Sequence, residues 1–259
     1  MTDEKLFYQR SGSGPLLLLL HPVGLDSTFW GDLPERLSQT HTVIAVDSRG
    51  HGRSADAARP AHMRDYVGDV IELIEALDHG PAILLGVSFG GMITQNVATS
   101  RPDLVAGLIA CGCPGVIPAA ARAAILQRGT DAEKGGMGAI VPATLERWFT
   151  PDFMKDPAVE AVRQRLLGNS PSNWAAAWEG VAEHDALAGL AGFSGPSLIV
   201  VGDRDAATPL DAARALAGAL PKGQLAILPG APHILQLESA EAFAAVIGEF
   251  LARLEQGRG

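Results

Sequence analysis

Positive charge is scarce in this sequence. The 259 residues include 20 Lys and Arg against 29 Asp and Glu, which gives a net charge of −9 and an isoelectric point near 5.2. No run of basic residues and no RNA-binding aromatic motif occurs. Because a protein that binds a nucleic-acid backbone needs a basic face, these absences exclude nucleic acid as a partner.

Cysteine is nearly absent as well. Cys111 and Cys113 are the only two, and one residue separates them. A structural disulfide is not expected between such neighbours in an intracellular chain. A metal site would need further ligands close by, which the scattered histidines do not supply. We therefore expect no metal and no other cofactor. The two thiols are expected at a strand end, where one of them can border a ligand pocket.

Long hydrophobic runs are missing too. The segment Leu16–Leu20 is strongly apolar, but five leucines are far too few to cross a bilayer, which takes about 20 residues. The first residues, Met1 to Lys5, have neither the basic region nor the apolar region of a secretory signal. The sequence predicts a cytoplasmic protein with no membrane partner, and it leaves open whether copies form a homo-oligomer.

What the sequence does contain is an alternation of short apolar runs with helical patterns. Apolar residues recur at helical spacing over 66–77 and 240–254. Continuous apolar strands between amphipathic helices indicate an α/β fold, with a mostly parallel sheet covered by helices on both faces. The expected strands are Leu16–Leu20, Val43–Val46, Ala82–Leu85, Leu104–Ala110, Leu198–Val201 and Leu225–Leu228.

One connection between expected strands is far longer than a crossover helix requires. It contains Trp148, Trp174 and Trp178, with helical patterns over 144–149 and 158–167. We interpret residues 114–190 as a helical cap inserted into a core formed by residues 1–113 and 191–259. Ligands bind beyond the carboxyl ends of the strands in such sheets, so the cap is expected to cover a pocket. The tryptophans are expected to form the core of the cap, with one or two of them facing the ligand.

The pentapeptide Gly86-Val87-Ser88-Phe89-Gly90 lies between an expected strand and a helical segment, residues 91–98. A Gly-x-Ser-x-Gly in that setting forms a tight, strained turn that lifts the serine hydroxyl above the sheet edge. The glycines are needed because a side chain at either position would collide with the neighbouring strand or helix. Ser88 is therefore the candidate nucleophile.

A serine hydroxyl needs an adjacent base, and that base needs a group that orients it. His233 follows the last expected strand, and Asp205 follows the strand before it. We predict His233 as the base and Asp205 as its acidic partner. Asp203 is an alternative for the acid, and a turn-forming or capping role is the alternative for Asp205. His51, His62, His79 and His184 are expected at the surface or hydrogen-bonded in the core.

Two backbone N–H groups are expected to stabilise the oxyanion of a tetrahedral intermediate. Phe89 supplies one, directly after the nucleophile. Val23 supplies the other, from the loop after the first long strand, because Pro22 has no N–H. His21 is expected to hold this loop by hydrogen bonding. In a second motif, Val46 to Ser54, we expect Asp47 and Arg49 to pair and brace the loops beside the site.

Together these motifs resemble those of the α/β-hydrolase superfamily over nearly the whole chain, and within it the 3-oxoadipate enol-lactonases. The cap carries the more specific likeness, in Gly135-Gly136-Met137 and in the run from Leu145 to Pro151. The run from Gly202 to Pro209 agrees as well. The resemblance implies Ser88, Asp205 and His233 as the catalytic triad and Trp148 as a pocket residue. Arg147 is the nearest candidate to bind a substrate carboxylate, and a solvated surface charge is its alternative reading.

The resemblance implies a serine hydrolase that opens a lactone or cleaves a carboxylic ester of a small molecule through an acyl-enzyme. The expected substrate is 3-oxoadipate enol-lactone or a related compound. Two alternatives use the same triad: hydrolysis of a C–C bond in meta-cleavage products, and cofactor-free perhydrolysis. Phe89 stands where the enol-lactonases usually have Met, beside the acyl pocket. A non-catalytic binding role is disfavoured because all three triad residue types are present in the expected order.

Overall fold

A computed structural model describes residues 6–256. A seven-stranded sheet runs through the molecule in the order β1-β3-β2-β4-β5-β6-β7. Strand β1 pairs antiparallel with β3, and all other neighbours are parallel. The strands are β1 (Tyr8–Ser11), β2 (Leu16–Leu20), β3 (Thr42–Val46), β4 (Ala82–Val87), β5 (Val105–Cys111), β6 (Ser197–Gly202) and β7 (Gly223–Leu228).

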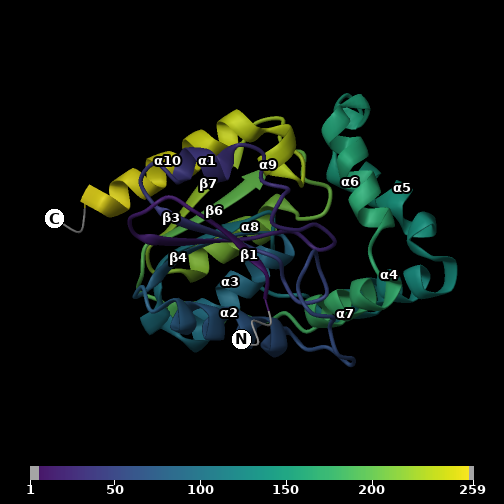
Figure 1. Ribbon diagram of the computed structural model, residues 1–259, viewed down its shortest axis with the longest axis horizontal. Coiled ribbons are helices and arrows are strands. Elements are labelled where there is room, and N and C mark those ends of the chain that lie inside the picture. The colour runs from purple at the N-terminus through teal and green to yellow at the C-terminus, as the bar shows by residue number, and fades with distance from the viewer. Residues whose placement is uncertain (1–5, 257–259) are drawn as a thin grey trace.

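Helices cover both faces of the sheet, so the predicted α/β fold class is confirmed (Figure 1). Alternate residues of a strand point to opposite faces. In β2, Leu18 packs into the cluster with α2, α3 and α8, whereas Leu17 packs with α1 and α10. Burial on both sides explains why these strands are apolar throughout. These helices are α1 (Leu33–Leu37), α2 (Met63–Leu77), α3 (Phe89–Ser100), α8 (Leu210–Ala219) and α10 (Ala240–Gln256).

Strand β1 is the one strand that the sequence analysis did not predict. It lies at the edge of the sheet, and three of its four residues are exposed. A strand with so little burial carries no continuous apolar run and no clear alternation, so the sequence has no signal for it. Its register, with Tyr8 opposite Val46, follows from pairing with the buried β3.

Four α-helices lie between β5 and β6, in the segment expected to form the cap, and we call these four helices the lid. They are α4 (Ala119–Gly135), α5 (Met137–Trp148), α6 (Pro157–Leu167) and α7 (Pro171–Ala182). In Figure 1 they stand beside the core as a separate group. Helices α4 and α7 approach closely because Gly129 has no side chain: a Cβ there would lie 2.8 Å from the Cα of Ala175.

The remaining elements are short connections. They are η1 (Pro102–Leu104), η2 (Phe153–Lys155), η3 (Gly189–Gly192) and α9 (Leu235–Glu238). None of the helices within residues 6–256 combines the length and the apolar character that crossing a membrane requires.

Candidate active site

Ser88 lies on the sharp turn between β4 and α3. Its φ of 54° and ψ of −115° fall in a region that residues other than glycine rarely adopt. The Ser88 N–H donates to the carbonyl of Cys111 at 2.7 Å, which helps to hold the turn. A Cβ on Gly86 would lie 2.3 Å from the carbonyl carbon of Gly90, and one on Gly90 would lie 1.9 Å from the carbonyl oxygen of Leu20. The steric reason predicted for both glycines is therefore confirmed.

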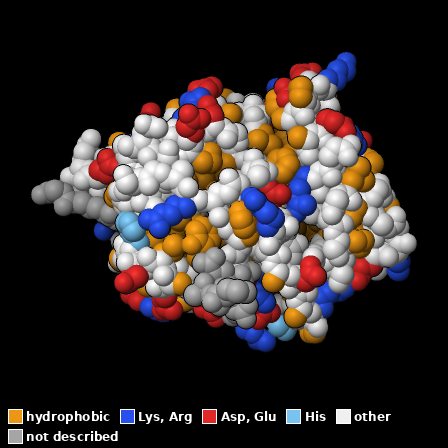
Figure 2. Space-filling model, in the orientation of Figure 1, with side chains coloured by type: hydrophobic (Ala, Val, Ile, Leu, Met, Phe, Trp, Pro, Cys, Tyr) orange, Lys and Arg blue, Asp and Glu red, His pale blue; other side chains and the backbone are white. Residues whose placement is uncertain are grey.

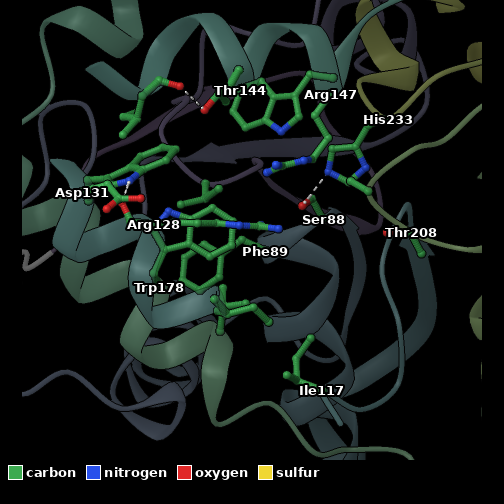
Figure 3. Close-up of a pocket in the computed structure, with 18 of the residues that line it drawn as sticks. Ser88, Phe89, Ile117, Arg128, Asp131, Thr144, Arg147, Trp178, Thr208 and His233 are labelled. Atoms are coloured by element: carbon green, nitrogen blue, oxygen red, sulfur yellow. Dashed lines mark hydrogen bonds between the residues drawn. The ribbon is translucent and has the colours of Figure 1, made fainter. Parts of the chain in front are cut away.

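The structure brings Ser88, His233 and Asp205 together at the carboxyl edge of the sheet. His233 Nε2 is 2.9 Å from Ser88 Oγ, and His233 Nδ1 is 2.9 Å from Asp205 Oδ2. Asp205 Oδ1 also accepts the backbone N–H groups of Ala207 and Thr208, each at 2.8 Å. Asp205 accepts a hydrogen bond from the Nδ1–H group of His233, which leaves Nε2 free to accept the serine proton. Figure 3 shows the Ser88–His233 hydrogen bond.

The two acidic candidates after β6 occupy different places. Asp203 Oδ1 accepts the backbone N–H of Gly230 at 2.6 Å and so ties two loops together. Asp205 is the one that contacts His233, and its side chain is fully buried. Asp205 therefore contacts His233 and also closes the turn to Ala207 and Thr208, whereas Asp203 links the loops that follow β6 and β7.

Val23 and Phe89 border the cavity next to Ser88. Among the described residues, the N–H of neither one has a hydrogen-bond partner. Phe89 begins α3, and the first N–H groups of a helix point out of it without an internal acceptor. Both groups are thus available to a substrate oxygen. The Phe89 ring packs edge-on against Tyr66, with 4.9 Å between the ring centroids.

His21 holds the loop that carries Val23, as predicted. Its Nδ1 donates to the carbonyl of Pro22 at 2.7 Å, and its Nε2 accepts the N–H of Ser48 at 3.0 Å. Burial lowers the pKa of His21 to about 4. The ring is therefore neutral at pH 7 and serves as a fixed link between two loops.

The lid also holds this loop, which the sequence analysis did not foresee. Asn169 Nδ2 donates to the carbonyl of Gly24 at 2.8 Å. Gly24 has a φ of +78°, and a Cβ there would lie 2.6 Å from both the Leu166 and the Trp174 side chains. Helices α6 and α7 thus press directly on the loop beside Val23. No signal in the sequence pairs residues this far apart in the chain.

A cavity of about 570 Å³ lies between the lid and the sheet, and Ser88 and His233 are in its wall. Arg147 and Trp148 border it, as predicted. All three lid tryptophans line the cavity, whereas only one or two of them were expected to face it. They are also buried, with Trp174 and Trp178 packed edge-on at 5.5 Å. Arg147 is half-buried in the cavity wall, and its role in binding a substrate carboxylate stays a prediction.

Cys111 and Cys113 are buried free thiols. Cys113 Sγ accepts a hydrogen bond from Gln95 Nε2 at 3.2 Å, and burial raises its pKa to about 12. Neither thiol is among the described residues that line the cavity, so the expectation that one borders a pocket was wrong. Since the thiolate is the reactive form, both thiols are chemically inert in the folded protein.

The predicted pairing of Asp47 with Arg49 was also wrong. Both Asp47 oxygens accept backbone N–H groups, from Ser27 at 2.7 Å and from Arg53 at 2.8 Å. Arg49 instead forms a bidentate pair with Asp69 of α2, with contacts of 2.5 and 2.6 Å. Asp47 still braces the loops beside the site, but it does so through the backbone.

His51, His62, His79 and His184 behave as expected. His51 and His184 are buried and hydrogen-bonded, with burial as the main cause of pKa values lowered to about 3 and about 4. His62 pairs with Glu183 near the surface, and His79 is exposed.

Fold and sequence together define the class of the protein. It belongs to the alpha/beta hydrolase family, whose family model matches residues 17–246. The chain is 30% identical to the (E)-2-((N-methylformamido)methylene)succinate hydrolase of Acinetobacter baylyi, over 90% of this chain and 89% of that protein. It is 28% identical to 3-oxoadipate enol-lactonase 2 of the same species, over 93% and 91% of the two chains.

Among solved structures, the enol-lactonase of Burkholderia xenovorans LB400 superimposes with a TM-score of 0.91 at 28% identity. The match covers 95% of this chain and 96% of that one. The resemblance to the α/β-hydrolase superfamily and to the enol-lactonases is confirmed. Hydrolysis is the activity that this membership supports.

Proposed function

We propose that the protein is a serine hydrolase that opens a lactone or cleaves a carboxylic ester of a small, carboxylate-bearing molecule through an acyl-enzyme. The observation that carries this proposal is the hydrogen-bonded series from Ser88 through His233 to Asp205. Ser88 and His233 border the cavity between the lid and the sheet. An enol-lactone related to 3-oxoadipate is the substrate best supported by the relatives. Both curated relatives are named for compounds of dicarboxylic acids.

In the first half-reaction, Ser88 Oγ attacks the carbonyl carbon while His233 Nε2 takes the hydroxyl proton. The N–H groups of Val23 and Phe89 donate to the oxygen that becomes negative. When the C–O bond breaks, His233 returns its proton to the leaving oxygen, which in a lactone remains part of the same acyl chain. Asp205 stabilises the imidazolium that forms between these two transfers.

In the second half-reaction, His233 takes a proton from water, and the resulting hydroxide attacks the acyl carbon. The Ser88–acyl bond then breaks, the proton returns to Ser88 Oγ, and the free acid leaves. Arg147 is positioned at the cavity wall to bind a carboxylate of the substrate, next to the apolar surface of Trp148. No step of this sequence requires a metal or another cofactor.

Substitution of the nucleophile tests the proposal. We expect Ser88→Ala to abolish hydrolysis of 3-oxoadipate enol-lactone and of p-nitrophenyl esters, with a loss of at least about 1,000-fold in kcat. A fluorophosphonate should label the wild-type protein with one equivalent at Ser88. Ser13→Ala, which removes an exposed serine, should change neither result. Full activity in Ser88→Ala would refute the proposal.

A second candidate uses the same three residues on another bond, the C–C bond of a meta-cleavage product, or transfers the acyl group to peroxide. One observation favours a reaction other than lactone opening: the relative at 30% identity is named (E)-2-((N-methylformamido)methylene)succinate hydrolase rather than a lactonase. A yellow dienone substrate decides the C–C reaction, because its absorbance fades only if that bond is cleaved. Formation of a peracid from an ester and hydrogen peroxide decides the perhydrolase reaction.

A further inference from the structure

Two arginines reach the cavity from different lid helices. Arg128 comes from α4 and Arg147 from α5, and both side chains extend toward the space above Ser88 (Figure 3). Within residues 6–256, no carboxylate oxygen lies within 4.0 Å of either guanidinium, and neither side chain donates a hydrogen bond. Both are half-buried. Two cations with unused donors therefore face the same cavity.

The other half-buried arginines within residues 6–256 are all ion-paired, and the other arginines that have no ion pair there are exposed. On the face shown in Figure 2, basic and acidic side chains lie next to one another. Arg36 pairs with Glu241, Arg59 with Glu179, and Arg101 with Glu75. The chain has an excess of acidic residues, so carboxylates are plentiful. The absence of one beside the two cavity arginines leaves room for a carboxylate that arrives with a ligand.

Arg128 is held in place although its guanidinium has no ion-pair partner in the described part of the chain. Its Cζ lies 4.5 Å from the centre of the Trp178 ring, a cation–π distance. Trp174 Nε1 donates to its backbone carbonyl at 3.2 Å, which fixes α4 against α7 at this point. Burial, and then the positive charge of Arg147, lower the pKa of Arg128 to about 10. The side chain is thus oriented before a ligand binds, and a bound anion would stabilise its charged form against both effects.

The other charges of the cavity wall do not offset the two arginines. Asp131 and Lys134 lie at its exposed rim, on the last two turns of α4, and their opposite charges offset each other. Asp131 accepts a hydrogen bond from Gln127 at 2.7 Å rather than from Arg128. Apart from the catalytic groups, the wall thus carries an excess of two positive charges, which two carboxylates would neutralise.

We propose that Arg128 is a second anion-binding residue and that the substrate carries two carboxylates besides the acyl group that Ser88 attacks. One carboxylate binds Arg147 and the other binds Arg128, each through a fork of two N–H donors. This inference rests on the proposed hydrolase function, and it shifts the expected substrate from 3-oxoadipate enol-lactone, which has one free carboxylate, to a lactone or ester with two. A substrate with one carboxylate would leave one half-buried cation without a partner.

Three p-nitrophenyl esters test the inference: butanoate without a free carboxylate, glutarate with one, and propane-1,2,3-tricarboxylate with two. We expect wild-type kcat/KM to rise with each added carboxylate. Arg128→Met should lower the ratio of kcat/KM for the two-carboxylate ester to that for the one-carboxylate ester by about 10- to 100-fold, the value of a charge-assisted hydrogen-bonded pair. Arg128→Lys should restore part of this ratio.

Arg122→Met is the matched control, because Arg122 lies on the same helix at an exposed position outside the cavity. It should leave all three kcat/KM values unchanged. Arg147→Met should reduce the preference for one carboxylate over none. If Arg128→Met instead lowers kcat/KM equally for all three esters, Arg128 is structural. If it affects the one-carboxylate and two-carboxylate esters equally, both arginines hold a single carboxylate. Either result overturns the proposal.

A binding measurement separates this inference from the proposed function. Calorimetry with Ser88→Ala and free propane-1,2,3-tricarboxylate requires no turnover. We expect the Ser88→Ala/Arg128→Met double variant to bind it about 10- to 100-fold more weakly, and to bind butanoate no differently. Failure of the hydrolase proposal would appear as unreactive esters and no fluorophosphonate labelling. Failure of the anion site would appear as an unchanged dissociation constant.

Discussion

The buried His21 makes folding sensitive to mild acid. Its Nε2 accepts the N–H of Ser48, a backbone donor that cannot rotate away, so a proton on Nε2 would break this hydrogen bond. Burial is the main reason that its pKa lies at about 4 instead of 6.5. In the unfolded chain the ring takes up a proton near pH 6.5, whereas in the folded protein it does so only near pH 4.

The sign and size of the effect follow from this difference. Between pH 6.5 and 4 the unfolded state binds more protons, so the free energy of unfolding decreases as the pH falls. At pH 5 the contribution of His21 amounts to about 2 kcal/mol relative to pH 7.5. His51 and His184, whose pKa values are also lowered, add losses of the same sign.

Urea unfolding at pH 7.5 and pH 5, followed by circular dichroism, measures this contribution. We expect His21→Asn to be less stable than wild type at pH 7.5, because it loses a well-packed ring. Its further loss on going to pH 5 should be about 2 kcal/mol smaller than that of wild type. His79→Asn removes an exposed histidine and serves as the control. Parallel stability losses for wild type and His21→Asn would refute the reasoning.

Two further predictions concern the turns around the candidate nucleophile. Asn169→Ala removes the hydrogen bond to the Gly24 carbonyl. We expect kcat for ester hydrolysis, measured by steady-state kinetics, to fall by about 3- to 10-fold with little change in KM. A change in KM alone would contradict this prediction. Gly90→Ala places a Cβ 1.9 Å from the Leu20 carbonyl oxygen and should lower the free energy of unfolding, measured by urea denaturation, by about 3 kcal/mol or more. Gly218→Ala, in a helix with nothing within 4 Å, should not destabilise the protein. Equal midpoints for the two glycine variants would contradict the steric argument.

The parallel strands and the meeting of three loop residues were predictable from sequence for one physical reason. A strand covered on both faces must be apolar throughout, as in Leu16–Leu20, so its ends are visible as changes in composition. Because parallel strands present their carboxyl ends at one edge, residues that follow different strands are brought together there. Ser88, Asp205 and His233 could therefore be proposed as neighbours from their places after β4, β6 and β7.

Other features depend on packing that local sequence does not encode. The pairing of Asp47 with Arg49 was predicted from their proximity in the chain. In the structure, backbone N–H groups donate to both Asp47 oxygens, and Arg49 pairs with Asp69 of α2. Arg128 lies in a helix whose apolar pattern is weak, so nothing in the sequence indicates which of its faces turns inward. That direction is set by the close approach at Gly129 between α4 and α7.

The contact between the lid and the loop at Gly24 has a consequence for how this protein can change. The same helices that shape the cavity also hold the backbone beside Val23, so a substitution that alters substrate selection can disturb the rate of the chemical step. A lid transplanted from a relative would meet a loop fitted to the side chains of Leu166 and Trp174. Exchange of specificity by recombination should therefore succeed when residues 21–26 travel with the lid, as one inherited unit.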